Sequence, residues 1–105
     1  MTAAIRTVYI VVADRKTGQR VKGVGLKRLA ELVRAGMPSG WATRRGGEYI
    51  TAGTRFLTLG PPYESTPVVK VRGNDLVRSR AVSMIRAAGW RIESITDYAR
   101  EEVTA

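Results

Sequence analysis

The sequence predicts an α+β domain in which two helices pack on one antiparallel sheet. Three observations support this fold class. Two segments carry apolar residues at three- and four-residue spacing, which is typical of a helix with one buried face. Short runs of β-branched and aromatic residues stand between and beside these segments. Glycine and proline punctuate the chain between the runs, as expected at the turns of a small sheet.

The first strand is expected at Arg6–Asp14, where apolar residues point to both faces. A strand that is apolar on both faces belongs in the middle of a sheet. A turn follows at positions 14–19, in which Gly18 is free to adopt a positive φ. Arg20–Gly25 is then predicted to return as a short strand, although its two glycines weaken it.

The first helix is expected at Leu26–Ala35. Gly36 ends it, and Pro38 prevents the helix from resuming. Its apolar face is predicted to comprise Leu26, Leu29, Ala30, Leu32 and Val33.

A hairpin is predicted around Gly46-Gly47, which separates Trp41–Arg45 from Glu48–Ala52. Gly53 then precedes another short strand at Arg55–Gly60. The prolines in Pro61–Pro67 favour an exposed loop that presents Tyr63.

The strand expected at Val68–Arg72 turns Val69 and Val71 inward and Lys70 and Arg72 outward.

The second helix is expected at Asp75–Ala88 and is the clearest element of the chain. Asn74 or Asp75 caps its N-terminus by accepting a backbone N–H bond, and Gly89 provides a left-handed residue at its end. Residues 90–93 alternate between apolar and charged side chains, which predicts a strand with one solvated face. The apolar stripe of the helix is predicted to comprise Leu76, Val77, Ala81, Val82, Ile85 and Ala88.

Without the extra strands, the elements follow the order β-α-β-β-α-β. This is the ferredoxin-like pattern, here with an extra hairpin, and it places both helices on one face of the sheet. An irregular α+β sheet of five or six strands is the alternative. We expect a single domain at residues 1–98 and a short frayed tail at residues 99–105. The tail contains Glu101 and Glu102, so the last part of the chain is more acidic than the rest.

Composition excludes several kinds of site. The 105 residues include no Cys and no His, which rules out disulfides, Cys or His zinc ligands, Cys nucleophiles and a Ser–His–Asp triad. We therefore expect no enzymatic activity and no cofactor or metal. The longest apolar run, Val8–Ala13, is far shorter than the about 20 residues that span a bilayer. We expect a cytoplasmic protein without a membrane partner.

The net charge of +9 favours an anionic partner, and nucleic acid, either DNA or RNA, is the leading expectation. Arginine suits phosphate because its planar guanidinium binds two oxygens at once. Trp41, Tyr49 and Phe56 lie among the arginines in the sequence and are candidates for stacking on bases. The candidate binding residues are Lys70, Arg72, Arg78, Arg80, Arg86, Arg91, Arg44 and Arg45.

Two alternatives stay open at this point. A small basic domain of this kind can dock on the acidic surface of a partner protein as an accessory or inhibitory factor. It can also be a subunit of a larger nucleoprotein or structural assembly. The sequence does not distinguish DNA, RNA and protein as partners, and it does not give the oligomeric state.

Overall fold

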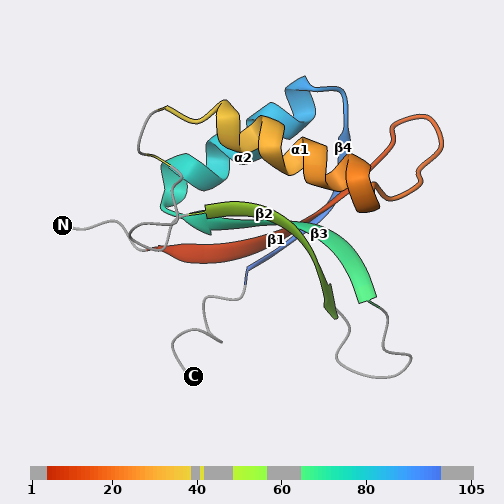
Figure 1. Cartoon of the computed structure of the whole chain (residues 1–105), viewed down its shortest axis with the longest axis horizontal. Coiled ribbons are helices and arrows are strands. Elements are labelled where there is room, and N and C mark those ends of the chain that lie inside the picture. The colour runs from red at the N-terminus through yellow and green to blue at the C-terminus, as the bar shows by residue number, and fades with distance from the viewer. Residues whose placement is uncertain (1–4, 39–40, 42–48, 57–64, 98–105) are drawn as a thin grey trace.

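The computed structural model describes residues 5–38, 41, 49–56 and 65–97. The strands form one antiparallel sheet in the order β2-β3-β1-β4. Both helices lie on the same face of this sheet (Figure 1), so the predicted fold class and the expected β-α-β-β-α-β order are confirmed. The elements are β1 (Arg6–Ala13), α1 (Gly23–Ala35), β2 (Tyr49–Phe56), β3 (Ser65–Gly73), α2 (Asp75–Ala87) and β4 (Arg91–Asp97).

Strand β1 lies inside the sheet, between β3 and β4. Its residues from Thr7 to Ala13 are all buried. Val8, Ile10 and Val12 face the helices and belong to the main core. On the other face, Tyr9 and Val11 form a small second cluster with Val68 of β3. The expectation of a central strand that is apolar on both faces is confirmed.

The main core lies between the helices and the sheet. The helices contribute Leu26, Leu29, Ala30 and Val33 from α1 and Val77, Ala81 and Ile85 from α2. Three residues that were expected on these apolar faces are exposed instead: Leu32 is 53% exposed, Leu76 is 63% exposed, and Ala88 is also exposed. A helix turns about 100° per residue, so Leu76 points well away from the stripe that begins at Val77. The same geometry turns Leu32 away from the core.

Helix α1 begins at Gly23, three residues before the predicted start. The short strand predicted at Arg20–Gly25 is wrong, because only Arg20 pairs, in an isolated bridge with Ala13. Glycine is costly in a helix interior, but Gly23 and Gly25 lie in the first turn, where fewer backbone hydrogen bonds depend on them. The predicted end of the helix before Gly36 is correct.

Strands β2 and β3 are longer than predicted. Gly53 does not interrupt β2, which runs on through Arg55 and Phe56, so Arg55 does not open a separate strand. Ser65, Thr66 and Pro67 belong to β3 and not to a loop. Pro67 pairs with Thr54 of β2, while the pairing of β3 with β1 ends at Val69. The missing N–H of proline is tolerated because β3 is paired on one side only at that point.

The predicted hairpin turn at Gly46-Gly47, the site candidates Arg44 and Arg45, and the tail at residues 99–105 lie outside the described residues. The same holds for residues 57–64, which contain most of the predicted proline loop.

Candidate nucleic-acid interface

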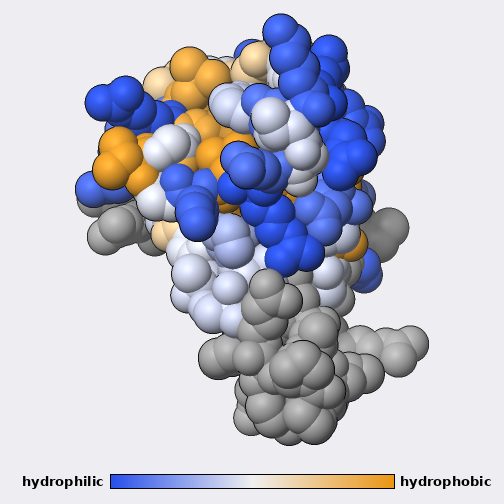
Figure 2. Space-filling model, turned by 90° about the vertical axis from the view of Figure 1, so that its right-hand side faces the viewer, coloured by the Kyte–Doolittle hydropathy of each residue, from blue (hydrophilic) through white to orange (hydrophobic). Residues whose placement is uncertain are grey.

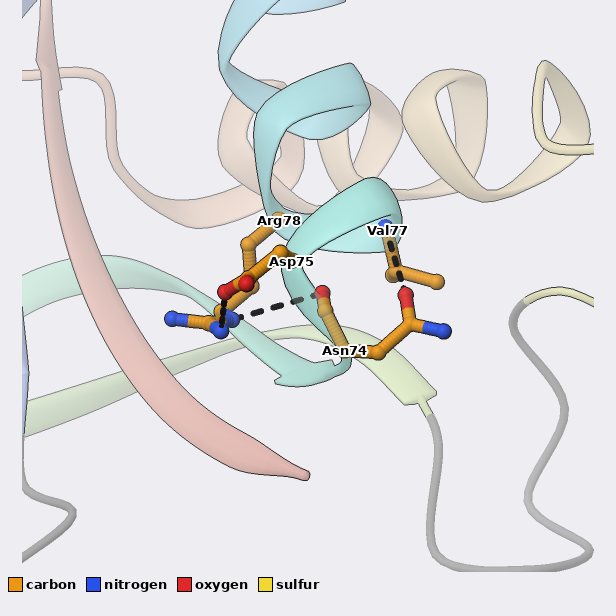
Figure 3. A network of polar contacts seen from close by, with 4 residues as sticks. All are labelled: Asn74, Asp75, Val77 and Arg78. Carbon is orange, nitrogen blue, oxygen red and sulfur yellow. Dashed lines mark hydrogen bonds and ion pairs between the residues drawn. The ribbon is translucent and has the colours of Figure 1, made fainter. Parts of the chain in front are cut away.

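The start of α2 holds Arg78 in place. Asn74 is the N-cap, and its Oδ1 accepts the N–H of Val77 at 3.0 Å, as the sequence predicts. The guanidinium of Arg78 donates through Nε to the backbone oxygen of Asn74 at 3.3 Å and pairs with the carboxylate of Asp75 (Figure 3). The side chain of Arg78 is only 16% exposed. Arg78 therefore stabilises the first turn of α2 more than it faces a partner.

Arg80 also has a structural contact. Its Nε and Nη2 donate to the backbone oxygen of Gly36 at 3.0 and 2.9 Å. This oxygen lies just past the C-terminal end of α1, so Arg80 joins the two helices. Arg80 is one of the candidate binding residues from the sequence, and in the structure its guanidinium is engaged within the fold.

Arg86 and Arg91 are exposed. The side chain of Arg86 has no hydrogen bond or ion pair within the described part of the chain, although its backbone oxygen accepts Nη2 of Arg15 at 3.4 Å. Arg91 stands opposite Ala13 where β4 pairs with β1. Both side chains are accessible, and they come from different elements.

Lys70 and Arg72 lie on the face of the sheet opposite the helices. Their neighbours Val69 and Val71 are fully buried in the core, and alternate residues of a strand point to opposite faces. Arg72 donates through Nη1 to the hydroxyl of Thr7 on the next strand at 3.2 Å. The predicted inward and outward residues of this strand are therefore correct.

Two tyrosines and one further arginine share that face with them. Lys70 Nζ lies 5.8 Å from the ring centre of Tyr9 and 5.3 Å from that of Tyr49. The guanidinium carbon of Arg55 lies 4.6 Å from the centre of the Tyr9 ring. These distances fall within the range of cation–π attraction, which holds the cations in place over the rings. We call Arg55, Lys70, Arg72, Tyr9 and Tyr49 the cationic sheet face.

Of the three aromatic residues considered for base stacking, only Tyr49 is described on this face. Trp41 packs against the main core on the helix side. The side chain of Phe56 lies outside the described residues. Tyr9, which the sequence analysis places only in a buried strand, belongs to the face instead. The alternation of Tyr9 with Val8 and Ile10 was the signal that places it there.

The turn between β1 and α1 is a second basic region. Figure 2 views the molecule from this side and shows hydrophilic residues over most of the described surface, with a smaller apolar area among them. Oδ1 of Asp14 accepts the N–H groups of Lys16 and Thr17 at 2.8 and 2.9 Å, and these bonds lower the pKa of its carboxyl. Gly18 closes the turn with a φ of 72°.

One arginine of this turn is paired. Nη2 of Arg20 lies 2.9 Å from Oε1 of Glu93 on β4, and Nε donates to Oε2 at 3.3 Å. This bidentate interaction lowers the pKa of the Glu93 carboxyl. Arg20 therefore ties the turn to the edge of the sheet and contributes little uncompensated charge.

The predicted binding residues are thus divided among several places. Lys70 and Arg72 are together, Arg78 and Arg80 are engaged in the helix layer, and Arg86 is exposed on α2. Arg91 is exposed on β4, where its pairing with Ala13 turns it to the sheet face opposite the helices. Among the residues that the structure describes, no three carboxylates gather as a metal site, and no helix is long and apolar enough to cross a membrane.

No protein-family model, no curated protein and no solved structure matches this chain. The function is therefore inferred from the side chains and their arrangement in the structure.

Proposed function

We propose that this protein binds nucleic acid electrostatically and that the cationic sheet face is the main contact surface. The observation that carries the proposal is the gathering of Arg55, Lys70 and Arg72 on adjacent strands β2 and β3. Arg55 lies over the ring of Tyr9, and Lys70 lies near the rings of both Tyr9 and Tyr49. A set of fixed cations on a broad face suits a chain of phosphates better than it suits a single small ligand.

The described residues that β1, β2 and β3 place on this face are basic or uncharged. In the described parts of β1, β2 and β3, the residues on this side are threonine, tyrosine, valine, glycine, alanine, lysine and arginine, with no Asp or Glu. Glu93, on the edge strand β4, is bound by Arg20. The charged side chains that these strands place on this face are thus all cations, which favours a polyanion.

The burial of Tyr9 beneath two cations indicates which part of a nucleic acid would meet this face. The Tyr9 side chain is only 6% exposed, and Arg55 and Lys70 lie over its ring. A base can stack on Tyr9 only if these cations move away, whereas a phosphate reaches them where they stand. Lys70 also lies over the ring of Tyr49, at 5.3 Å from its centre. We therefore expect backbone contacts with little sequence preference.

The test compares two double variants that remove the same charge. Arg55→Ala with Lys70→Ala removes two cations of the sheet face, and Arg28→Ala with Arg86→Ala removes two exposed cations from the helices on the other side of the sheet. Binding of labelled single- and double-stranded DNA and RNA is measured by fluorescence anisotropy between about 50 and about 200 mM salt. We expect log affinity to fall linearly with log salt, and the slope to decrease by roughly one for each lost phosphate contact in the sheet-face variant.

Two results would contradict the proposal. Absence of binding to any of the four nucleic acids at low salt would reject nucleic-acid binding and favour an acidic protein partner. A slope that changes only in the Arg28 and Arg86 variant would move the contact away from the sheet face. Circular dichroism melting of both variants shows whether each is folded under the binding conditions.

A further inference from the structure

A groove separates α1 from the edge strand β2. Its volume is about 650 Å³, and it is lined by residues of both elements and by the start of β3. The floor is apolar and includes Leu26, Ala30, Ile50 and Ala52. Two of these four residues are alanines, so the side chains do not fill the space between the helix and the strand.

The edge of β2 forms one wall of the groove. Within the described residues β2 pairs only with β3, and Thr51, Ala52, Gly53 and Thr54 all line the groove. Consecutive residues of a strand point to opposite faces, so a wall made of all four is the backbone edge itself. Natural edge strands are usually guarded by charged residues, proline or bulges. The stretch from Ile50 to Thr54 has neither a charged residue nor proline.

The rim of the groove is basic. Lys22, Lys27 and Arg34 line it, against the single carboxylate of Glu31. None of these three cations makes a side-chain hydrogen bond or ion pair within the described chain. The N-terminal end of α1 opens onto the same groove at Lys22 and Gly23, with no side-chain cap and no acidic residue in its first turn. Negative charge is favoured at such a helix end.

We propose that this groove binds an extended segment of a partner protein in which apolar side chains alternate with acidic ones. The segment adds a strand to β2 through backbone hydrogen bonds, its apolar side chains enter the space between α1 and the strand, and its carboxylates meet the rim cations. Strand addition beside a helix is an established mode of peptide recognition.

The chemistry of the groove disfavours the other occupants. The apolar floor offers nothing to phosphates, and a nucleic acid has no backbone amides for the strand edge. Two copies of this chain each carry a net charge of +9, and their basic rims would face each other if β2 paired with β2. An extended peptide with alternating apolar and acidic residues can make apolar contacts with the floor, backbone hydrogen bonds with the strand edge and ion pairs with the rim.

The probe is a fluorescein-labelled peptide of four Glu-Val repeats with blocked ends. We expect saturable binding to the full chain and chemical-shift changes at the amides of Lys27, Thr51 and Gly53. A peptide with Lys in place of Glu, and a Glu-Val peptide with N-methyl groups on alternate amides, are the controls. Affinity should fall at least about tenfold for each, because the first loses charge complementarity and the second loses strand pairing.

The protein variants test the rim in the same way. Lys27→Glu with Arg34→Glu should weaken binding of the Glu-Val peptide at least about tenfold, since two attractive contacts become repulsive. Arg86→Glu with Arg91→Glu makes the same change of net charge away from the groove and should change the affinity much less. Equal effects of the two variants would show that net charge alone attracts the peptide and would overturn the proposal.

Three further results would also overturn it. They are no binding of the Glu-Val peptide, equal binding of its N-methylated form, and shift changes confined to the cationic sheet face. Self-association through β2 would appear instead as a concentration-dependent mass in sedimentation experiments without peptide. Because the groove and the cationic sheet face are separate surfaces, this test can fail while nucleic-acid binding holds, and the reverse is also true.

Discussion

The guanidinium of Arg80 on α2 donates two hydrogen bonds, at 3.0 and 2.9 Å, to the backbone oxygen of Gly36 at the end of α1. The last carbonyls of a helix lack partners within the helix. Arg80 supplies one from a residue 44 positions away in the chain. This contact fixes the end of α1 against α2 and explains why an exposed arginine occupies this position.

We expect Arg80→Ala to destabilise the fold by about 1 kcal/mol, the usual net value of a hydrogen bond that is lost from a partly exposed site. Arg86→Ala is the matched control, because the Arg86 side chain makes no such contact within the described residues. Urea denaturation measures both. If the two variants unfold at the same urea concentration, the contact with Gly36 contributes no stability.

Gly73 allows the end of β3 to pass close to α2. A Cβ atom at this position would lie 2.8 Å from both Cβ and Cγ1 of Val77, which is too close for carbon atoms. Val77 is fully packed and branched at Cβ, so it cannot move aside. We expect Gly73→Ala to cost about 1–3 kcal/mol of stability, as for an overpacked core.

Gly53 provides the control for this prediction. It lies in β2, and a Cβ atom there would meet nothing within 4 Å. Gly53→Ala should therefore leave the free energy of unfolding unchanged or raise it slightly, since alanine loses less backbone entropy on folding. Similar losses in both variants would mean that Val77 does not limit the space at Gly73.

The cap of α2 was predictable from sequence because it is local. Asn74 accepts the N–H of Val77, three residues away, in the pattern that identifies helix starts. We expect Asn74→Ala to cost about 1 kcal/mol and Asn74→Asp to keep most of the stability, because aspartate caps equally well. Thermal melts of the two variants check this. An alanine variant as stable as the original would show that Arg78 and Asp75 hold the helix start without the cap.

The parts of the fold that follow from local pattern were predicted correctly. Val77, Ala81 and Ile85 recur at helical spacing, and β1 is apolar on both faces, so their burial follows from the order of residues. The exposed Leu76 shows the limit of counting apolar residues, since its position around the helix decides its burial. The extent of β3 was missed because Pro67 is normally read as a break.

The candidate site was harder to predict because it depends on register between distant strands. Lys70 is paired with Tyr9 of β1 and with Thr51 of β2, and no local pattern specifies these partners. The outward direction of Lys70 was predictable, but its place over two tyrosine rings was not. In the same way, the role of Arg80 depends on where α1 ends relative to α2, which only the packed structure shows.

The ion pair between Arg20 and Glu93 makes the stability of the fold depend on pH. Arg20 lowers the pKa of the Glu93 carboxyl in the folded protein. A carboxyl whose pKa is lower in the folded than in the unfolded state adds stability at pH values above its unfolded pKa, about 4.3 for glutamate. This contribution is lost as the pH falls through the folded pKa. The Arg20–Glu93 pair therefore helps at neutral pH and disappears in acid.

We expect Glu93→Gln to destabilise the protein by about 0.2–1 kcal/mol at pH 7, the range for ion pairs that are partly exposed. The difference between the variant and the original chain should shrink steadily as the pH falls below about 4. Glu31→Gln, on the exposed side of α1, is the control for loss of one negative charge. Urea denaturation from pH 7 to about pH 3 measures the stability of all three proteins.

Because Arg20 lowers the pKa of Glu93, Arg20→Gln should reproduce the loss of stability. The double variant should then lose little more stability than either single variant. A difference between Glu93→Gln and the original chain that stays constant with pH would show that Glu93 acts through packing and not through its charge.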